Sequence, residues 1–216
     1  SLHILILAAG EGKRMRSRRP KVLLPVAGKP MLSHVLETAR ALHPGGIRVV
    51  FGHRGEQLQA AYRDATDIAW VHQASQRGTG HAVGLALDGL PDDARVLVLY
   101  GDVPLLTAAT LAPMAAGTGL QVLTATLDNP HGYGRVVVDA NGLVSAIVEE
   151  RDADASTRAI RVVNTGVIAC GVGALRAWLA RITPNNAQGE LYLTDVFGLA
   201  AASGAGATTV ACADPS

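Results

Sequence analysis

The chain has 216 residues, of which 49% are hydrophobic and 17% are charged. This composition supplies a substantial apolar core and excludes a disordered chain. With 19 basic and 18 acidic residues the formal net charge is only +1. Bulk electrostatic attraction to nucleic acid or to an anionic membrane is therefore excluded as the main mode of binding. The length predicts one domain, residues 1–216, without a linker.

Aliphatic runs separated by helical spacing predict an α/β fold in the first half of the chain. The runs are Leu2–Leu7, Ile47–Phe51, Ile68–Val71, Arg95–Tyr100 and Leu120–Thr126. Helical spacing is found over Met31–Leu42, Glu56–Tyr62, Thr79–Leu87 and Thr107–Met114. Because the runs lack polar alternation, we expect strands covered on both faces, in a Rossmann-like, mostly parallel sheet flanked by helices.

The second half predicts a smaller β-rich lobe that shares the same sheet and makes it mixed. Arg135–Asp139 and Leu143–Glu150 flank an Asn-Gly turn and predict a hairpin. A strand over Val162–Ala169, helices over Ala174–Arg181 and Glu190–Ala202, and a strand near Thr208–Cys212 complete the prediction. The uncharged stretch from Val196 to Ala213 holds three glycines and favours a buried helix and strand over a membrane span.

The cysteines predict the cellular compartment, and the distribution of charge predicts the class of binding partner. Cys170 and Cys212 have no metal-ligand spacing, so we expect a reducing, cytoplasmic setting. Residues 11–21 carry six basic residues against Glu11, a local net charge of +5. Such a loop is typical of a small-anion site, and the simpler alternative is a solvated loop. No aromatic residue lies between Gly10 and Lys21, which disfavours nucleic acid as the partner.

The loop after the first strand is the first candidate site. Ligands of open α/β sheets bind outside the carboxyl ends of the strands. Small residues at 8–10 and Gly12 let backbone N–H groups approach a phosphate, and Arg14 and Lys21 add charge. The dinucleotide fingerprint fails at Met15, and the Walker pattern fails because Gly28-Lys29 precedes a proline.

Two further loops carry candidate ligands of the same crevice. Gln73 offers an amide whose donor and acceptor can both face one edge of a base, and Gly78 permits close approach of the backbone. Thr79 is predicted to cap the following helix. A plain strand–loop–helix connection is the alternative. Asp102 ends a strand and suits Mg²⁺, which takes one or two carboxylates with phosphate and water. An Asx turn before Pro104 is the alternative there.

The β-rich half carries weaker signals. Gly134 can present a backbone N–H, and Glu149 and Asn164 can bind sugar hydroxyls or an amide, although each residue type is common in turns and on surfaces. Glu190 is predicted to serve the N-terminus of the following helix.

Taken together, these motifs resemble a known family. In order they are Leu-Ala-Ala-Gly at 7–10, Gln-Ala-Ser-Gln-Arg-Gly-Thr-Gly-His-Ala at 73–82, Tyr-Gly-Asp-Val-Pro-Leu at 100–105, Gly-Tyr-Gly-Arg at 132–135, Ile-Val-Glu at 147–149, Asn-Thr-Gly at 164–166 and Asn-Ala-Gln-Gly-Glu-Leu-Tyr-Leu-Thr-Asp at 186–195. The set is similar to the uridylyltransferase domain of the bifunctional bacterial N-acetylglucosamine-1-phosphate uridylyltransferase / glucosamine-1-phosphate acetyltransferase.

The resemblance implies a Mg²⁺-dependent reaction of UTP with N-acetylglucosamine 1-phosphate, giving pyrophosphate and the cell-wall precursor UDP-N-acetylglucosamine. It implies catalytic roles for Arg14, Lys21 and Asp102, with Asp102 as the metal ligand. It implies nucleotide contacts, within residues 1–126, from Leu7, Ala8, Ala9, Gly10, Gln73, Gln76, Gly78, Thr79, Tyr100 and Gly101. It implies sugar contacts, within residues 127–216, from Gly134, Glu149, Asn164, Tyr192 and Thr194.

Two departures from the family leave alternatives open. The family completes its metal site with a downstream asparagine, and none follows Asn186 here. A catalytically weak nucleotide-sugar-binding module is therefore one alternative, and a transferase for another sugar phosphate is the second. No hexapeptide repeat occurs, so we expect no β-helix acetyltransferase domain in this sequence and carry over no trimer.

Overall fold

The fold is an α/β sheet covered by helices, described here from a computed structural model for residues 1–10 and 19–212. The strands of the main sheet are β1 (Leu2–Leu7), β4 (Gly46–Phe51), β5 (Ile68–His72), β6 (Arg95–Tyr100), β7 (Leu120–Thr126), β8 (Arg135–Val138), β9 (Val144–Val148), β10 (Val162–Gly171) and β11 (Ala207–Ala211). The helices are α1 (Met31–Ala41), α2 (Gly55–Ala61), α3 (Thr79–Ala86), α4 (Ala108–Ala116), α5 (Ala155–Arg158), α6 (Val172–Leu179) and α7 (Asp195–Ala202). A 3-10 turn, η1 (Lys21–Leu23), and a two-stranded ribbon of β2 (Pro25–Val26) and β3 (Lys29–Pro30) lie outside the main sheet.

The main sheet is mixed and mostly parallel, as the sequence predicted. Its strand order is β11-β7-β10-β6-β1-β4-β5, with the β8–β9 hairpin attached to β10. The pairs of β1 with β4, β1 with β6, β4 with β5 and β7 with β11 are parallel, whereas β10 runs antiparallel to both of its neighbours. Strands of the β-rich half therefore belong to the same sheet as those of the first half.

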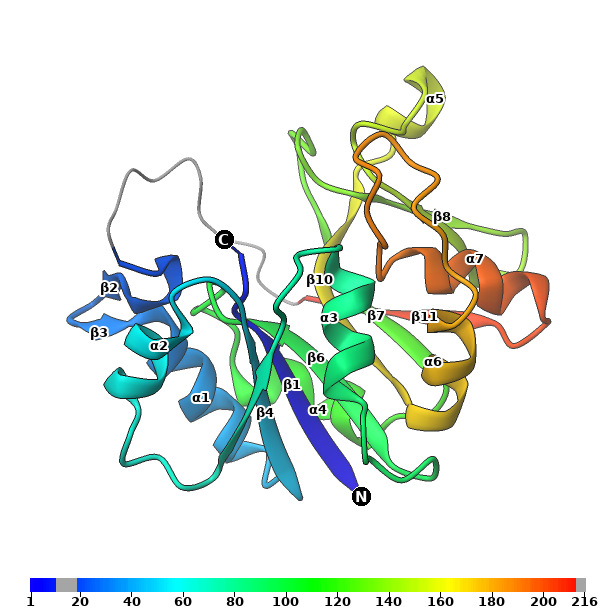
Figure 1. Cartoon of the computed structure of the whole chain (residues 1–216). Coiled ribbons are helices and arrows are strands. Elements are labelled where there is room, and N and C mark those ends of the chain that lie inside the picture. The colour runs from blue at the N-terminus through cyan, green and yellow to red at the C-terminus, as the bar shows by residue number, and fades with distance from the viewer. Residues whose placement is uncertain (11–18, 213–216) are drawn as a thin grey trace.

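Alternate residues of β1 enter two separate hydrophobic cores. Ile4 and Ile6 face the core that contains α1, α2 and α4, whereas Leu5 and Leu7 face the core that contains α3, α6 and α7. In Figure 1, α3 lies in front of the sheet and α4 behind it. Burial on both faces is the physical reason why this strand is an unbroken aliphatic run.

The strand order creates a crevice at one edge of the sheet. The chain passes from β1 to β4 and β5 on one side, and then returns to place β6 on the other side of β1. Such a reversal of strand order separates the loops at the carboxyl ends of the two strands and opens a ligand site between them. The loops that follow β1 and β6 begin with Ala8 and Gly101, and Gly101 N–H donates to the Leu7 carbonyl at 2.9 Å.

The predicted start of the last helix was wrong. The sequence predicted a helix from Glu190, but α7 begins at Asp195, and residues 190–194 form irregular chain and a turn. Leu191 N–H donates to the Arg77 carbonyl and the Leu191 carbonyl accepts from Gly80 N–H, each at 2.8 Å. These bonds engage the Leu191 backbone elsewhere, so Glu190 does not serve the N-terminus of α7.

Membrane-spanning helices are not found in the part of the chain that the structure describes: each helix there is too short or too polar for that purpose.

Candidate active site

A pocket of about 400 Å³ lies at the carboxyl ends of β1 and β6. Nine of the residues predicted to bind a nucleotide line it: Leu7, Ala8, Ala9, Gly10, Gln73, Gln76, Gly78, Thr79 and Tyr100. The tenth, Gly101, is buried behind the wall, where an added Cβ would lie 3.1 Å from Val22 Cγ1. Gly101 therefore permits close packing beside the pocket, and its contact with the nucleotide stays a prediction.

The loop between β5 and α3 is held against the first loop by its own amides. Gln73 is 4% exposed, and its Nε2 donates to the Gly78 carbonyl at 3.1 Å. Gln76 Nε2 donates to the Ala9 carbonyl at 2.6 Å. Gly78 has a φ of +110°, and an added Cβ would lie 2.5 Å from the Leu191 carbonyl oxygen. Glycine is therefore required at 78 by both backbone conformation and space.

The predicted capping function of Thr79 was wrong. Gly78 is the N-cap residue of α3, and Thr79 is the first residue of the helix. Thr79 Oγ1 instead accepts a hydrogen bond from Leu193 N–H at 3.0 Å. The residue thus ties the nucleotide loop to the segment that precedes α7.

Opposite charges meet at the mouth of this pocket. Lys21 Nζ donates to Asp102 Oδ2 at 2.6 Å, and the two side chains are 38% and 30% exposed. An ion pair this open to water contributes little to folding stability. Both groups line the pocket and remain accessible to a charged ligand. Arg14, the third predicted catalytic residue, lies outside the described residues.

The donor set around Asp102 fits one kind of metal site. Residues 1–10 and 19–212 contain no cluster of three or more His, Cys, Asp or Glu side chains able to hold an ion. A cage made only of protein ligands is therefore absent from that part of the chain. Mg²⁺ is commonly held by one or two carboxylates together with substrate phosphates. The partly exposed carboxylate of Asp102 fits that arrangement.

A second pocket of about 320 Å³ adjoins the first and shares Thr79, Tyr100 and Glu190 with it. All five residues predicted to bind a sugar line this second pocket: Gly134, Glu149, Asn164, Tyr192 and Thr194. They come from the residue before β8, the chain after β9, strand β10 and the segment before α7. The two predicted groups of ligands thus occupy two contiguous cavities.

An irregularity in β10 shapes the border between the two pockets. The register of β10 against β7 shifts between Asn164 and Ile168. Gly166 lies within this bulge at a φ of +92°, and an added Cβ would lie 2.7 Å from Tyr100 Cε2. Bulges commonly re-aim side chains next to active sites. Here the bulge makes room for the Tyr100 ring beside Asn164.

Glu149 is a partly buried carboxylate at the floor of the second pocket. Thr194 Oγ1 donates to its Oε1 at 3.0 Å. Burial raises the pKa of Glu149, and the charges of Asp152 and Asp195 raise it further, against the opposing hydrogen bond from Thr194. Burial also raises the pKa of Tyr100, to which the charges of Glu149 and Asp102 contribute. Burial therefore makes the charged form of Glu149 unfavourable.

This environment gives Glu149→Gln an expected gain in stability. Because folding raises the pKa of Glu149, the free energy of unfolding falls as pH rises through that pKa. Glutamine at position 149 does not ionise, so it removes this loss of stability, and its side-chain oxygen can still accept the hydrogen bond from Thr194. We expect Tm near neutral pH to rise by about 2–4 °C, the shift that 1 kcal/mol produces in a chain of this size. Thermal unfolding of the variant and the unmodified domain at neutral pH, and again at a pH equal to the ordinary carboxyl pKa, measures the difference in Tm. This difference should vanish at the lower pH.

Glu37→Gln is the matched control for that measurement, with the opposite sign. The hydrogen bond from Lys29 lowers the pKa of Glu37, so its contribution to stability is present above the ordinary carboxyl pKa and is lost in acid. An unchanged or lower Tm for Glu149→Gln near neutral pH would contradict the assignment of an unfavourable buried charge.

Several lining residues were not predicted as ligands, among them Gln188, Glu190, Tyr133 and Val103. Gln188 Nε2 donates to the Tyr192 hydroxyl at 2.7 Å, and Glu190 lines both pockets. Tyr133, 48% exposed, and Val103 also line the second pocket. Their positions in the sequence could have indicated them, because each of the four lies inside a motif that was noted for its other residues.

Residues 4–162 match the family model described as "MobA-like NTP transferase domain". The chain belongs to this family. The matched range contains most of the first pocket, including Lys21, Asp102 and the loop from Gln73 to Thr79. This MobA-like domain is accordingly a nucleotidyltransferase.

Longer relatives carry a more specific name. A "Bifunctional protein GlmU" of Xanthomonas euvesicatoria pv. vesicatoria (strain 85-10) is 55% identical over 99% of this chain and 47% of its own length. A protein of the same name from Xylella fastidiosa (strain M23) is 55% identical over 93% of this chain and 44% of its own length. The chain spans about half the length of the curated relatives it matches.

Solved structures of low identity share the fold. A putative glucose-1-phosphate thymidylyltransferase from Bacillus anthracis, in complex with a sucrose, superposes with a TM-score of 0.79 at 22% identity, covering 99% of this chain and 87% of that one. A UDP-glucose pyrophosphorylase complexed with UDP-glucose superposes with a TM-score of 0.76 at 17% identity, covering 96% and 89%. These matches support the mixed, mostly parallel sheet with flanking helices.

Proposed function

We propose that this domain transfers a uridylyl group from UTP to N-acetylglucosamine 1-phosphate, forming UDP-N-acetylglucosamine and pyrophosphate. The proposal rests on the family and on the relatives named "Bifunctional protein GlmU". We further propose that the chain acts as one domain, with a nucleotide-binding part at 1–126 and a sugar-binding part at 127–216.

One observation carries the proposal: the two predicted groups of ligands line two contiguous pockets that meet at Thr79, Tyr100 and Glu190. A transferase must hold two substrates with their reacting atoms adjacent, because proximity and orientation supply much of the rate enhancement. A border shared by two pockets suits the point at which the α-phosphate of one substrate meets the phosphate of the other.

The reaction requires charge neutralisation more than proton transfer. A phosphate oxygen of the sugar phosphate attacks the α-phosphorus of UTP, a new P–O bond forms, and pyrophosphate leaves with the electron pair of the bond that breaks. The attacking oxygen is already anionic, so a strong general base is unnecessary. Lys21 Nζ lies in the first pocket and would neutralise charge on the phosphates. We assign Arg14 the same function from the motif.

Asp102 is the residue that would hold Mg²⁺ together with substrate phosphate oxygens. When bound, the ion would supply Lewis-acid neutralisation of the phosphates. Lys21 and Asp102 form an ion pair, and triphosphate binding would draw Lys21 towards the phosphates and free the carboxylate for the ion.

A single in-line displacement predicts inversion of configuration at the α-phosphorus. With UTP carrying a chiral α-thiophosphate, the nucleotide sugar should have the opposite configuration at phosphorus, because one attack from the rear leaves no second step to restore it. ³¹P NMR of the product measures the configuration. Retention would indicate a covalent enzyme intermediate and would contradict the single displacement.

The nucleotide half of the proposal is tested by base selectivity. Pyrophosphate release with N-acetylglucosamine 1-phosphate and Mg²⁺ should be fastest with UTP among UTP, CTP, GTP and dTTP, and mass spectrometry should identify UDP-N-acetylglucosamine. Tight UDP-N-acetylglucosamine binding without turnover would instead favour a binding module, and a preference for another nucleotide would contradict the assignment of uracil to the pocket around Gln73.

A further inference from the structure

Arg135 is a buried cation next to the second pocket that the proposed reaction does not use. It is the first residue of β8 and follows Gly134 directly. Its side chain is only 2% exposed. Arginine is rarely buried unless its charge and its donors are satisfied, so its partners indicate what it stabilises.

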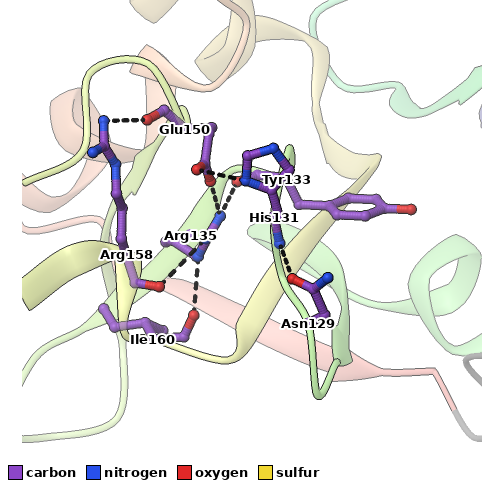
Figure 2. Close-up of polar contacts among 7 residues, drawn as sticks. All are labelled: Asn129, His131, Tyr133, Arg135, Glu150, Arg158 and Ile160. Atoms are coloured by element: carbon purple, nitrogen blue, oxygen red, sulfur yellow. Dashed lines mark hydrogen bonds and ion pairs between the residues drawn. The ribbon is translucent and has the colours of Figure 1, made fainter. Parts of the chain in front are cut away.

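The guanidinium spans two segments of backbone (Figure 2). Nε donates to the Ile160 carbonyl at 3.0 Å and an Nη atom donates to the Arg158 carbonyl at 3.3 Å. The other Nη donates to the Tyr133 carbonyl. The rigid five-donor fork of arginine can make these bonds at the same time, whereas the single ammonium of lysine cannot.

Glu150 completes the arrangement as the charged partner. Its Oε2 lies 2.7 Å from an Nη atom of Arg135, and its Oε1 lies 3.4 Å from His131 Nδ1. Burial acts to raise the pKa of Glu150, but the ion pair with Arg135 lowers it overall and favours the charged carboxylate.

One of the partners of Arg135, Tyr133, lines the second pocket. The residues from Gly132 to Gly134 line that pocket, and Glu150 directly follows the pocket residue Glu149. The Gly134 carbonyl accepts a hydrogen bond from Asn164 N–H at 2.9 Å, which links the same loop to another residue that lines the second pocket. An added Cβ at Gly134 would lie 3.3 Å from Glu149 Oε2, so a small displacement of this loop would change the shape of the pocket.

We propose that Arg135 and Glu150 are positioning residues for the second pocket: together they fix the Gly132–Gly134 loop against the end of β9, and so set the affinity for the sugar 1-phosphate without touching it. This inference rests on the proposed function for the identity of the ligand. The inference does not extend to the first pocket. Within the described part of the chain, neither the Arg135 nor the Glu150 side chain is bonded to a residue that lines that pocket.

The test is a comparison of Arg135→Lys with the unmodified domain. Lysine keeps the charge beside Glu150 but cannot bridge the carbonyls of Tyr133 and Ile160. We expect KM for N-acetylglucosamine 1-phosphate to rise about tenfold, the effect of losing one or two hydrogen bonds. We expect kcat and KM for UTP to stay unchanged. Equal increases in both KM values, or unchanged kinetics, would overturn the proposal.

Arg95→Lys is the matched control. Arg95 is also a partly buried arginine that donates to the Met114 and Gly119 carbonyls, each at 2.9 Å, but it is remote from both pockets. We expect its substitution to leave both KM values unchanged. A rise in KM for the sugar phosphate in this control would indicate general loosening of the fold and would overturn the specific assignment.

Hydrogen–deuterium exchange provides a readout that needs no substrate. The amides of residues 131–134 should exchange faster in Arg135→Lys and in the milder Glu150→Gln, and not in Arg95→Lys. If Arg135→Lys fails to fold, Glu150→Gln decides the question by the same two measurements. If the unmodified domain shows no turnover but the two variants still exchange these amides faster, the positioning is supported and the proposed function is contradicted. Unchanged exchange at these amides in the variants would overturn the positioning.

Discussion

Lys21→Ala is expected to lower kcat/KM for pyrophosphate release by about 100- to 1,000-fold, the effect of removing one charge-stabilising donor from a polar transition state. Lys21 Nζ lies in the first pocket, 2.6 Å from Asp102, and is partly exposed to incoming substrate. Folding stability should hardly change, because exposed ion pairs contribute about 0–1 kcal/mol. Steady-state kinetics and thermal unfolding of the same preparation measure both effects.

Lys29→Ala is the matched control for this prediction. Lys29 forms a comparable ion pair with Glu37 at 2.8 Å, with both side chains 54% exposed, and it lines neither pocket. Its removal should leave kcat/KM unchanged. Equal activity of the Lys21 and Lys29 variants would remove Lys21 from the catalytic residues.

The second large effect is expected at Asp102. Asp102→Ala removes the carboxylate that we assign to Mg²⁺, and Mg²⁺-dependent turnover should fall below detection. Asp102→Asn keeps the size of the side chain but only a neutral oxygen, so it should retain weak activity that requires more Mg²⁺. Rates measured across a Mg²⁺ titration distinguish these outcomes from a loss of folding.

Asp92→Ala serves as the control for Asp102. Asp92 pairs with Arg176 at the protein surface and is remote from both pockets. Its removal should leave the Mg²⁺ dependence intact. A Mg²⁺ dependence for Asp102→Asn identical to that of the unmodified domain would show that Asp102 is not the metal ligand.

The strands were predictable from sequence because burial on both sheet faces produces unbroken aliphatic runs. β1, β6 and β7 match the predicted ranges at both ends. The start of α7 was not predictable, because its apolar spacing extends back to Leu191. Leu191 N–H donates to the Arg77 carbonyl, and Gly80 N–H donates to the Leu191 carbonyl. These bonds hold the segment against the start of α3, and such long-range contacts cannot be predicted from a local pattern.

The members of the site were predictable as motifs, but their juxtaposition was not. Thr79 illustrates the difference: local sequence indicates a helix cap, whereas the folded chain uses its hydroxyl to bind Leu193 N–H, 114 residues away. Gly166 illustrates it again, since its bulge has meaning only beside the Tyr100 ring. Arg135 stood inside a singled-out motif, yet only the structure revealed its bonds to the backbone around the second pocket.

The sugar specificity of pyrophosphate release tests the central claim most directly. The domain, UTP and Mg²⁺ are incubated with N-acetylglucosamine 1-phosphate or with glucose 1-phosphate, and the initial rates give kcat/KM for each. We predict that kcat/KM for N-acetylglucosamine 1-phosphate is larger by at least about tenfold, because a pocket whose polar groups match the acetamido group leaves them unpaired with glucose. Equal values, a preference for glucose 1-phosphate, or no pyrophosphate release would contradict the claim.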